Sequence, residues 1–209
     1  QSLIVRMQIC GKSANRFDSI FANLLRDIED RQHTIIQLTD TLQSHIDNIS
    51  DESFKEAFTD YSTPDRNISE FYLRHIENYY RQVNQDAITL SPNSNLTVEH
   101  IIPQSLPNNW YDERENIPQD FRDNVVERIG NKALLFGPEN ASAGNRTYLE
   151  KVDVYREGIR NSNNEIICTP IATFHLISKL VEKYPNRFTH EEVNERAREL
   201  AEIAAIIWS

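Results

Sequence analysis

The sequence predicts an α+β protein that is mainly α, in which a helical scaffold carries one small ββα unit. Over most of the 209-residue sequence, apolar side chains recur at helical spacing. Between Thr89 and Gly144 this spacing stops, and two short apolar runs, TVEHII and KALLF, predict strands. We therefore expect a single domain over residues 1–209, with a ββα insert at about 89–157 inside a scaffold of 1–88 and 158–209.

Four stripes of aliphatic and aromatic residues predict the scaffold helices, and we interpret all four as core. The first two are Phe17, Ile20, Phe21, Leu24, Leu25 and Ile28, after Ser13-Ala14-Asn15, and Ile35, Leu38, Leu42, Ile46 and Ile49. The third is Phe71, Ile76, Tyr79, Tyr80 and Val83, behind a capping-box pair, Asn67 and Glu70. The fourth is Val193, Ala197, Leu200, Ala204 and Ile207, behind a similar pair, Thr189 and Glu192.

The insert contains two further elements between and after its strands. The stretch PQDFRDNVVERIG predicts a short helix for which Gly130 is the expected C-cap. After Gly144, the stretch RTYLEKVDVYREG has helical spacing again. The strands and the second of these helices make up the ββα unit.

Composition excludes several classes of protein. A net charge of −10 argues against a nonspecific polyanion binder, although a local basic groove for nucleic acid remains compatible with it. Cys10 and Cys168 lack the CxxC spacing of a zinc knuckle, and we expect two reduced cysteines. No apolar run has the length of a membrane span, so we expect no membrane partner. Two reduced cysteines are typical of a cytoplasmic protein, which is the location we expect. Because the chain begins with Gln1 and its only methionine is Met7, we expect a fragment or a processed product.

An acid and an imidazole lie side by side at the expected end of the first strand, Glu99 and His100. Because side chains alternate along a strand, the two can serve different partners. Metal-assisted phosphodiester hydrolysis needs a carboxylate for a divalent cation and a neutral imidazole for the proton of water. Magnesium keeps several waters, so one carboxylate and one amide oxygen are a sufficient protein contribution. Asn131, before the second strand, and Asn140, nine residues later, are candidates to complete such a site.

The two boxes VEHIIPQS and GNKALLFGPEN resemble the HNH, or ββα-metal, nuclease motif. More of the chain resembles the C-terminal domain of GmrSD-type restriction endonucleases. That resemblance includes the opening VRMQICGKSANRF, the EHIxP box, the GN box, a downstream Asn and Lys, and the terminal ERARELAEIAAIIW. It covers nearly the whole chain.

The resemblance implies a role for each site residue. His100 resembles the general base that deprotonates the attacking water, and Asn131 the residue that pins the loop and orients this histidine. Glu99 and Asn140 resemble the ligands of an Mg²⁺ or Mn²⁺ ion, with Asn145 as the competing choice for Asn140. Tentative DNA contacts are Lys132, Asn145, Arg146 and Lys151. Two residues depart from the commonest HNH form: Glu99 replaces an Asp, and Lys132 replaces a Leu.

Simpler interpretations stay open beside these roles. Arg146 and Lys151 are either solvated helix charges or DNA contacts, and Asn131 is either a structural turn residue or a catalytic one. We interpret His75, His175 and His190 as structural or exposed, and Trp110 and Trp208 as packing residues.

The resemblance implies an HNH-type DNA endonuclease or nickase that serves as the nuclease module of a bacterial anti-phage or modification-dependent restriction protein. Its expected partners are DNA and an N-terminal nucleotide-hydrolysing domain absent from this chain. Two alternatives stay open: a catalytically inactive nucleic-acid-binding or regulatory module of the same fold, and an RNase.

Overall fold

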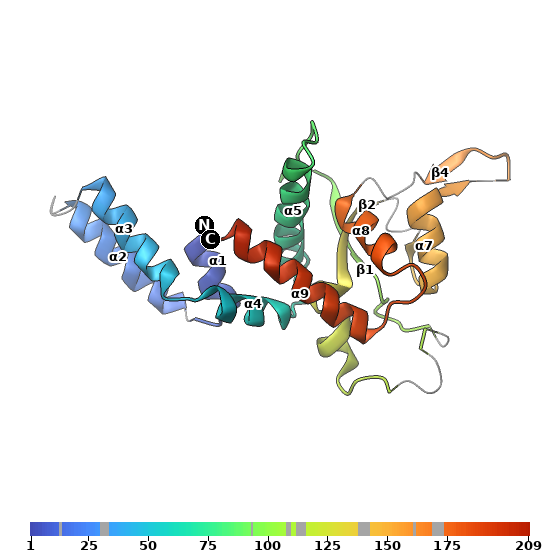
Figure 1. Cartoon of the computed structure of the whole chain (residues 1–209), viewed down its shortest axis with the longest axis horizontal. Coiled ribbons are helices and arrows are strands. Elements are labelled where there is room, and N and C mark those ends of the chain that lie inside the picture. The colour runs from blue at the N-terminus through green and yellow to red at the C-terminus, as the bar shows by residue number, and fades with distance from the viewer. Residues whose placement is uncertain are drawn as a thin grey trace. The chain divides into compact units, whose positions relative to one another are not determined.

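The computed structural model describes residues 1–12, 14–29, 34–92, 94–107, 110–111, 116–137, 143–160, 162–168 and 174–209. The chain forms two compact units, one of residues 1–61 and 201–209 and the other of residues 62–200. Helices dominate, and the strands described form two small antiparallel sheets (Figure 1). The predicted class, α+β and mainly α, is confirmed.

The first unit is built from helices around a buried arginine, Arg6. Its helices are α1 (Ser2–Ile9), α2 (Ala14–Glu29), α3 (Ile35–Asp47), α4 (Asp51–Thr59) and the end of α9 (His190–Ile207). Arg6 donates from Nε to Trp208 O at 2.7 Å and from Nη1 to Ile49 O at 2.8 Å. Its Nη2 bonds the Asp51 carboxylate. One side chain thus satisfies backbone carbonyls at the ends of two helical segments that are remote in sequence.

The apolar stripes of α2 and α3 are less buried than their sequences predict. Ile20, Leu24 and Ile49 are buried, but no residue within α3 is. The exposed members of the two stripes are Phe21, Leu25, Ile28 and Ile35. The prediction that these stripes are core is therefore wrong for most of their described members, because neighbouring elements of the unit cover only part of the apolar face of each helix. The side chain of Phe17 lies outside those described.

The helices of the second unit begin at side-chain caps. Helix α5 (Arg66–Val83) begins after Asp65, whose carboxylate accepts hydrogen bonds from Asn67 N at 2.8 Å and Ile68 N at 3.2 Å. The expected cap at Asn67 is therefore wrong, because the helix begins earlier. At α9 the expected pair is confirmed: Glu192 Oε2 accepts from Thr189 N at 2.6 Å.

A buried glutamate on α5 caps another helix, α8 (His175–Lys183). The Glu77 carboxylate accepts from His175 N at 3.0 Å and from Leu176 N at 2.9 Å. Arg81 donates to the same carboxylate at 2.9 Å. The negative charge thus lies at the positive end of the α8 dipole, where it is stabilising. This contact docks α8 on α5.

Both predicted strands form, as β1 (Leu96–His100) and β2 (Lys132–Phe136), and they pair antiparallel. The register places Glu99 opposite Ala133 and His100 opposite Lys132. Helices α5 and α8 pack against this sheet, and α7 (Tyr148–Glu157) follows it along the chain (Figure 1). A second hairpin, β3 (Ile159–Arg160) and β4 (Ile166–Cys168), comes after α7. Glu99 and His100 are thus the last two residues of β1, as expected.

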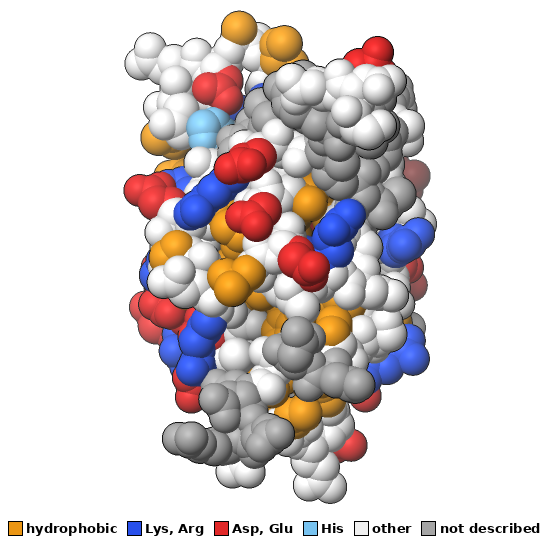
Figure 2. All heavy atoms as spheres, turned by 90° about the vertical axis from the view of Figure 1, so that its right-hand side faces the viewer, with side chains coloured by type: hydrophobic (Ala, Val, Ile, Leu, Met, Phe, Trp, Pro, Cys, Tyr) orange, Lys and Arg blue, Asp and Glu red, His pale blue; other side chains and the backbone are white. Residues whose placement is uncertain are grey.

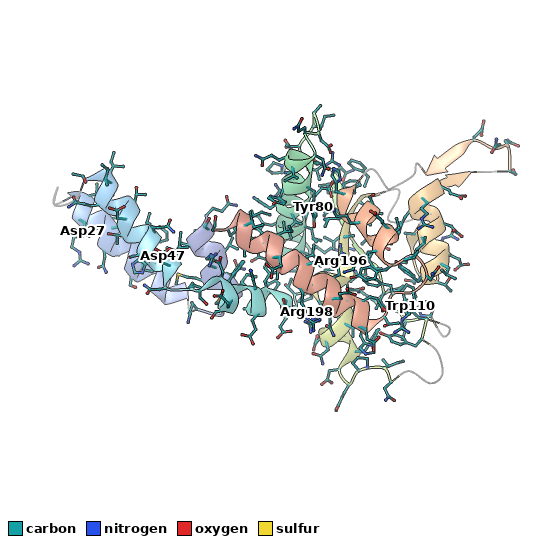
Figure 3. All side chains as sticks on the ribbon, in the orientation of Figure 1. Asp27, Asp47, Tyr80, Trp110, Arg196 and Arg198 are labelled. Atoms are coloured by element: carbon teal, nitrogen blue, oxygen red, sulfur yellow. The ribbon has the colours of Figure 1, made fainter. Side chains whose placement is uncertain are left out.

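The segment before β2 differs from its prediction. In place of one helix capped by Gly130, it has a π-type turn at Arg122–Val126 and a 3₁₀ turn at Ile129–Asn131. Gly130 is needed for close packing instead, since a Cβ there would lie 2.1 Å from Val193 O on α9. Arg196, also on α9 (Figure 3), donates from Nη1 to Gly130 O at 2.7 Å and to Lys132 O at 2.8 Å. Burial lowers the pKa of Arg196 to about 10, so the guanidinium stays charged at neutral pH.

None of the described helices combines the length and apolar character of a membrane span. Cys10 carries a free thiol, and the side chain of Cys168 lies outside those described.

Gly130→Ala should lower the free energy of unfolding by about 3 kcal/mol, because backbone atoms of α9 cannot move away from the new methyl group. Urea denaturation followed by circular dichroism measures the loss. Gly137→Ala is the matched control, since its nearest contact, Thr97 Cγ2, is 3.9 Å away. The control should change stability by no more than about 0.5 kcal/mol. Equal stability of the two variants would contradict the close packing.

Candidate functional site

The last two side chains of β1 face different partners. Glu99 is 3% exposed, and its Oε1 accepts hydrogen bonds from Lys151 Nζ at 2.5 Å and from Tyr155 Oη at 3.0 Å. His100 Nε2 lies 3.4 Å from Glu127 Oε2. The strand alternation predicted this divergence, but it did not predict which groups the two side chains would contact.

The Glu99–Lys151 pair fixes α7 to the end of β1. Lys151 is fully buried, and its ammonium also donates to His100 O at 2.7 Å. Burial raises the pKa of Glu99 and lowers that of Lys151, whereas their mutual attraction opposes both shifts. Because Tyr155 adds a further hydrogen bond, the carboxylate has two donors on one oxygen.

Asn131 ties the chain that leaves β1 to the chain that enters β2. Its side chain is fully buried, and its Oδ1 accepts from Ile102 N at 2.8 Å. Its Nδ2 donates to Ile102 O at 2.9 Å and to Val126 O at 3.1 Å. All three are positioning contacts to backbone, so any effect of Asn131 on a reaction would come through His100 and Glu99.

A second buried ion pair lies on the other side of β1. Lys132 Nζ lies 2.9 Å from Glu127 Oε2, and it also donates to Thr63 O and, at 3.2 Å, to Ser69 Oγ. Burial lowers the pKa of Lys132, against the opposing effect of Glu127. Glu127 was not among the predicted site residues. Its only sequence signal is an acid within the apolar run VVERIG, directly before the Gly-Asn pair.

An open cavity of about 140 Å³ brings the strand-end pair together with two other elements. Its lining residues are Arg66, Val98, Glu99, His100, Pro103, Gln104, Gly144 and Asn145. Asn145 was predicted for this site, whereas Arg66, at the start of α5, was not. No sequence signal identifies Arg66, because it is distant in the chain and reaches the cavity only through the packing of α5 on the sheet.

Burial of the histidine ring sets its protonation state. The pKa of His100 lies below the usual 6.5, chiefly because burial disfavours the imidazolium and also because Lys132 is near. Glu127 opposes this shift without reversing it. The ring is therefore neutral at pH 7, which is the form that accepts a proton.

The remaining predicted residues have different outcomes. Asn140 lies outside the described residues, and Arg146 is exposed beside Asn145. The tentative DNA contacts of Lys132 and Lys151 do not fit this structure, since the two side chains are 1% and 0% exposed and pair with carboxylates. Both lysines serve instead as buried counterions.

The histidines and tryptophans interpreted as structural lie outside the cavity lining. His75 Nδ1 lies 2.8 Å from Phe71 O, and His175 Nε2 lies 2.9 Å from Asp86 Oδ2. Trp110 Nε1 donates to Phe188 O at 2.7 Å, and Trp208 is buried. These contacts account for the side chains by packing and local bonding.

The oxygen atoms of the side chains that line the cavity suit a hard cation as ligands. A carboxylate offers about four acceptor positions, so the two donors on Glu99 Oε1 leave capacity for a cation. The Asn145 amide lines the same cavity. No cluster of three or more His, Cys, Asp or Glu side chains able to hold a metal occurs in the described part of the chain, so a closed zinc site is not formed there. One carboxylate and one amide oxygen fit Mg²⁺ or Mn²⁺, which keep water ligands.

Comparison with protein families identifies the class of protein as a restriction-endonuclease module. A family model that describes the C-terminal domain of GmrSD restriction endonucleases matches residues 48–203, about three quarters of the chain. The chain belongs to this family. The matched range includes every residue that lines the cavity. Neither a curated protein nor a solved structure matches the chain significantly.

Asn131→Asp should destabilise the protein by about 3 kcal/mol, because a carboxylate cannot donate to the buried carbonyls of Ile102 and Val126. The midpoint and slope of a urea denaturation curve provide the measurement. Asn145→Asp, the same change at an exposed position, should cost no more than about 0.5 kcal/mol. A small loss of stability at both positions would show that the Asn131 hydrogen bonds are not needed for the stability of the fold.

Proposed function

We propose that the protein is a metal-dependent DNA endonuclease of the HNH type, which nicks a strand by phosphodiester hydrolysis and leaves a 5′-phosphate. One observation carries the proposal. A neutral imidazole, His100, and a carboxylate, Glu99, line the same open cavity as the Asn145 amide and the Arg66 guanidinium. A base, a hard-cation ligand and a phosphate-binding cation are the groups that this reaction needs.

The residues of the chain have separate roles in this reaction. His100 accepts a proton from the attacking water, and Asn131 holds the backbone beside it in place. Glu99 holds Mg²⁺ or Mn²⁺ together with Asn140 or Asn145. When bound there, the cation stabilises negative charge on the leaving 3′ oxygen.

In this proposal DNA contacts the protein at the cavity and not over a broad surface. The described side chains on the face near α7 and the β3–β4 hairpin are mixed in sign, with acidic and basic groups interspersed (Figure 2). The net charge of −10 also argues against a broad polyanion-binding surface. Arg66 lines the cavity, and Arg146 is exposed next to Asn145. We therefore assign phosphate contacts to Arg66, Asn145 and Arg146, whose planar fork or amide donors suit phosphate oxygens.

The family supports a place in a restriction system. We propose that the protein acts in the cytoplasm of a bacterium against phage or modified foreign DNA, joined to an N-terminal nucleotide-hydrolysing domain. In this arrangement the chain described here supplies the cleavage step.

Supercoiled plasmid incubated with the purified chain and Mg²⁺ or Mn²⁺ tests the activity. We expect nicked product that EDTA suppresses, and a loss of about 10²–10⁴-fold in rate for His100→Ala, as is typical when a general base is removed. His45→Ala on α3 is the matched control and should cleave like wild type. Cleavage by His100→Ala at the wild-type rate would contradict the role of His100.

The same assay separates the alternatives. A wild-type chain that binds plasmid without cutting it would favour the inactive nucleic-acid-binding module. Preferential cleavage of a single-stranded RNA in parallel reactions would favour an RNase.

Glu99→Gln should weaken Mn²⁺ binding at least about 10-fold, a loss seen even for residues that only support a metal ligand. Isothermal titration calorimetry on the purified chain measures this affinity without requiring cleavage. The exposed Glu182→Gln on α8 provides the control. Unchanged Mn²⁺ affinity in Glu99→Gln would place the cation elsewhere.

A further inference from the structure

A buried carboxylate that the HNH pattern does not include lies against the histidine ring. Glu127 is 2% exposed, and its Oε2 lies 3.4 Å from His100 Nε2. We propose that Glu127 is a positioning residue that accepts the Nε2–H of His100 and so leaves Nδ1 as the nitrogen that takes the proton from water. This inference rests on the proposed function, since it names the group that orients the proposed base.

The charge of Glu127 decides the direction of this hydrogen bond. Burial raises the pKa of the Glu127 carboxyl, but the hydrogen bond and charge of Lys132, with the contact to His100, outweigh burial and hold it below the usual 4.5. An ionised carboxylate only accepts, so the imidazole must be the donor. The 3.4 Å distance is long for a hydrogen bond, but such contacts at catalytic histidines often tighten only when substrate binds.

The second ring nitrogen of His100 is thereby left for chemistry. Within the described residues, no side chain or backbone group bonds Nδ1, and the ring lines the cavity. A neutral imidazole carries its proton on one nitrogen only, so a proton on Nε2 leaves a lone pair on Nδ1. Glu127 therefore selects the tautomer as well as the orientation of the ring, as the buried acid does in a Ser-His-Asp triad.

Glu127 is itself held from several sides, which limits the movement of the ring. Lys132 Nζ lies 2.9 Å from Oε2, and Gln104 Nε2 donates to Oε1 at 3.2 Å. The backbone carbonyl of Glu127 accepts from Thr63 N at 3.0 Å. Lys132 is in turn fixed by Thr63 O and Ser69 Oγ, so the carboxylate is anchored to the start of α5.

A merely structural role would make Glu127 the counterion of Lys132 and nothing more. The two roles differ when both charges are removed together. An apolar pair of similar volume can replace a buried ion pair at little cost in stability. Such a replacement would leave the fold intact but would remove the acceptor for His100 Nε2.

The first experiment compares Glu127→Met with the double variant Glu127→Met/Lys132→Met in plasmid nicking with Mg²⁺. The double variant should recover most of the melting temperature that the single variant loses. Both should show kcat lowered by up to about 10⁴-fold with KM nearly unchanged, since altering the acid that orients the histidine of a Ser-His-Asp triad lowers kcat by about that factor. Glu127→Gln, which keeps an oxygen that accepts from both Lys132 and His100, should retain more activity than Glu127→Met. Glu182→Gln is the control at an exposed position.

Recovery of wild-type kcat in the double variant would overturn the positioning role and leave Glu127 as a counterion only. Loss confined to KM would overturn it as well, since a positioning residue for the base acts on the chemical step.

The second experiment needs no cleavage. Nitrogen-15 NMR of the metal-free full chain in EDTA at pH 8 reports the tautomer of His100, with His100→Gln to identify its signals. We expect the Nε2–H tautomer in wild type and a shift toward Nδ1–H in the double variant. A wild-type Nδ1–H tautomer would overturn the inference even if the protein cuts DNA. The expected tautomer in a protein that does not cut would refute the proposed function and leave the Glu127–His100 contact established.

Discussion

The hydrogen bonds of the Asn131 side chain fix the geometry on which the site depends. They hold the backbone after β1 against the backbone before β2, at the point where the two strands diverge. A buried backbone group left without a partner costs about 1–3 kcal/mol, so one amide that satisfies three such groups strongly favours this loop geometry. The positions of Glu99 and His100 follow, since both lie on the strand end that this amide anchors.

Two buried lysine–glutamate pairs flank that strand end. The pair Lys151–Glu99 connects it to α7, and the pair Lys132–Glu127 connects it to the start of α5 through Thr63 and Ser69. Buried ion pairs contribute little net stability, because desolvation offsets their attraction, but breaking one is costly. We infer that these pairs serve to define geometry, since together they leave neither carboxylate free to turn away from the site.

The same two ion pairs determine which positively charged side chains are accessible at the cavity. The two lysines are withdrawn from solvent, and among the described residues that line the cavity the cationic one is Arg66. Arginine suits this position because its planar fork bonds two oxygens of one phosphate, whereas lysine acts as a point charge. The protein thus presents positive charge where the proposed phosphate binds, although its net charge is −10.

Local features of the sequence determined the two strands, the position of the Glu99–His100 pair, the cap of α9 and the mainly α class, because periodicity and caps depend on neighbours in the chain. Burial in α2 and α3, the role of Gly130 and the burial of Lys132 and Lys151 were decided only by the tertiary structure. Whether a lysine meets solvent or a carboxylate depends on residues remote in sequence, such as Glu99 for Lys151. For the same reason no sequence signal indicated that Arg66 belongs to the site, and only a weak signal indicated Glu127. The sequence determined which groups end β1, and the packing of α5, α7 and the segment before β2 decided what each of them faces.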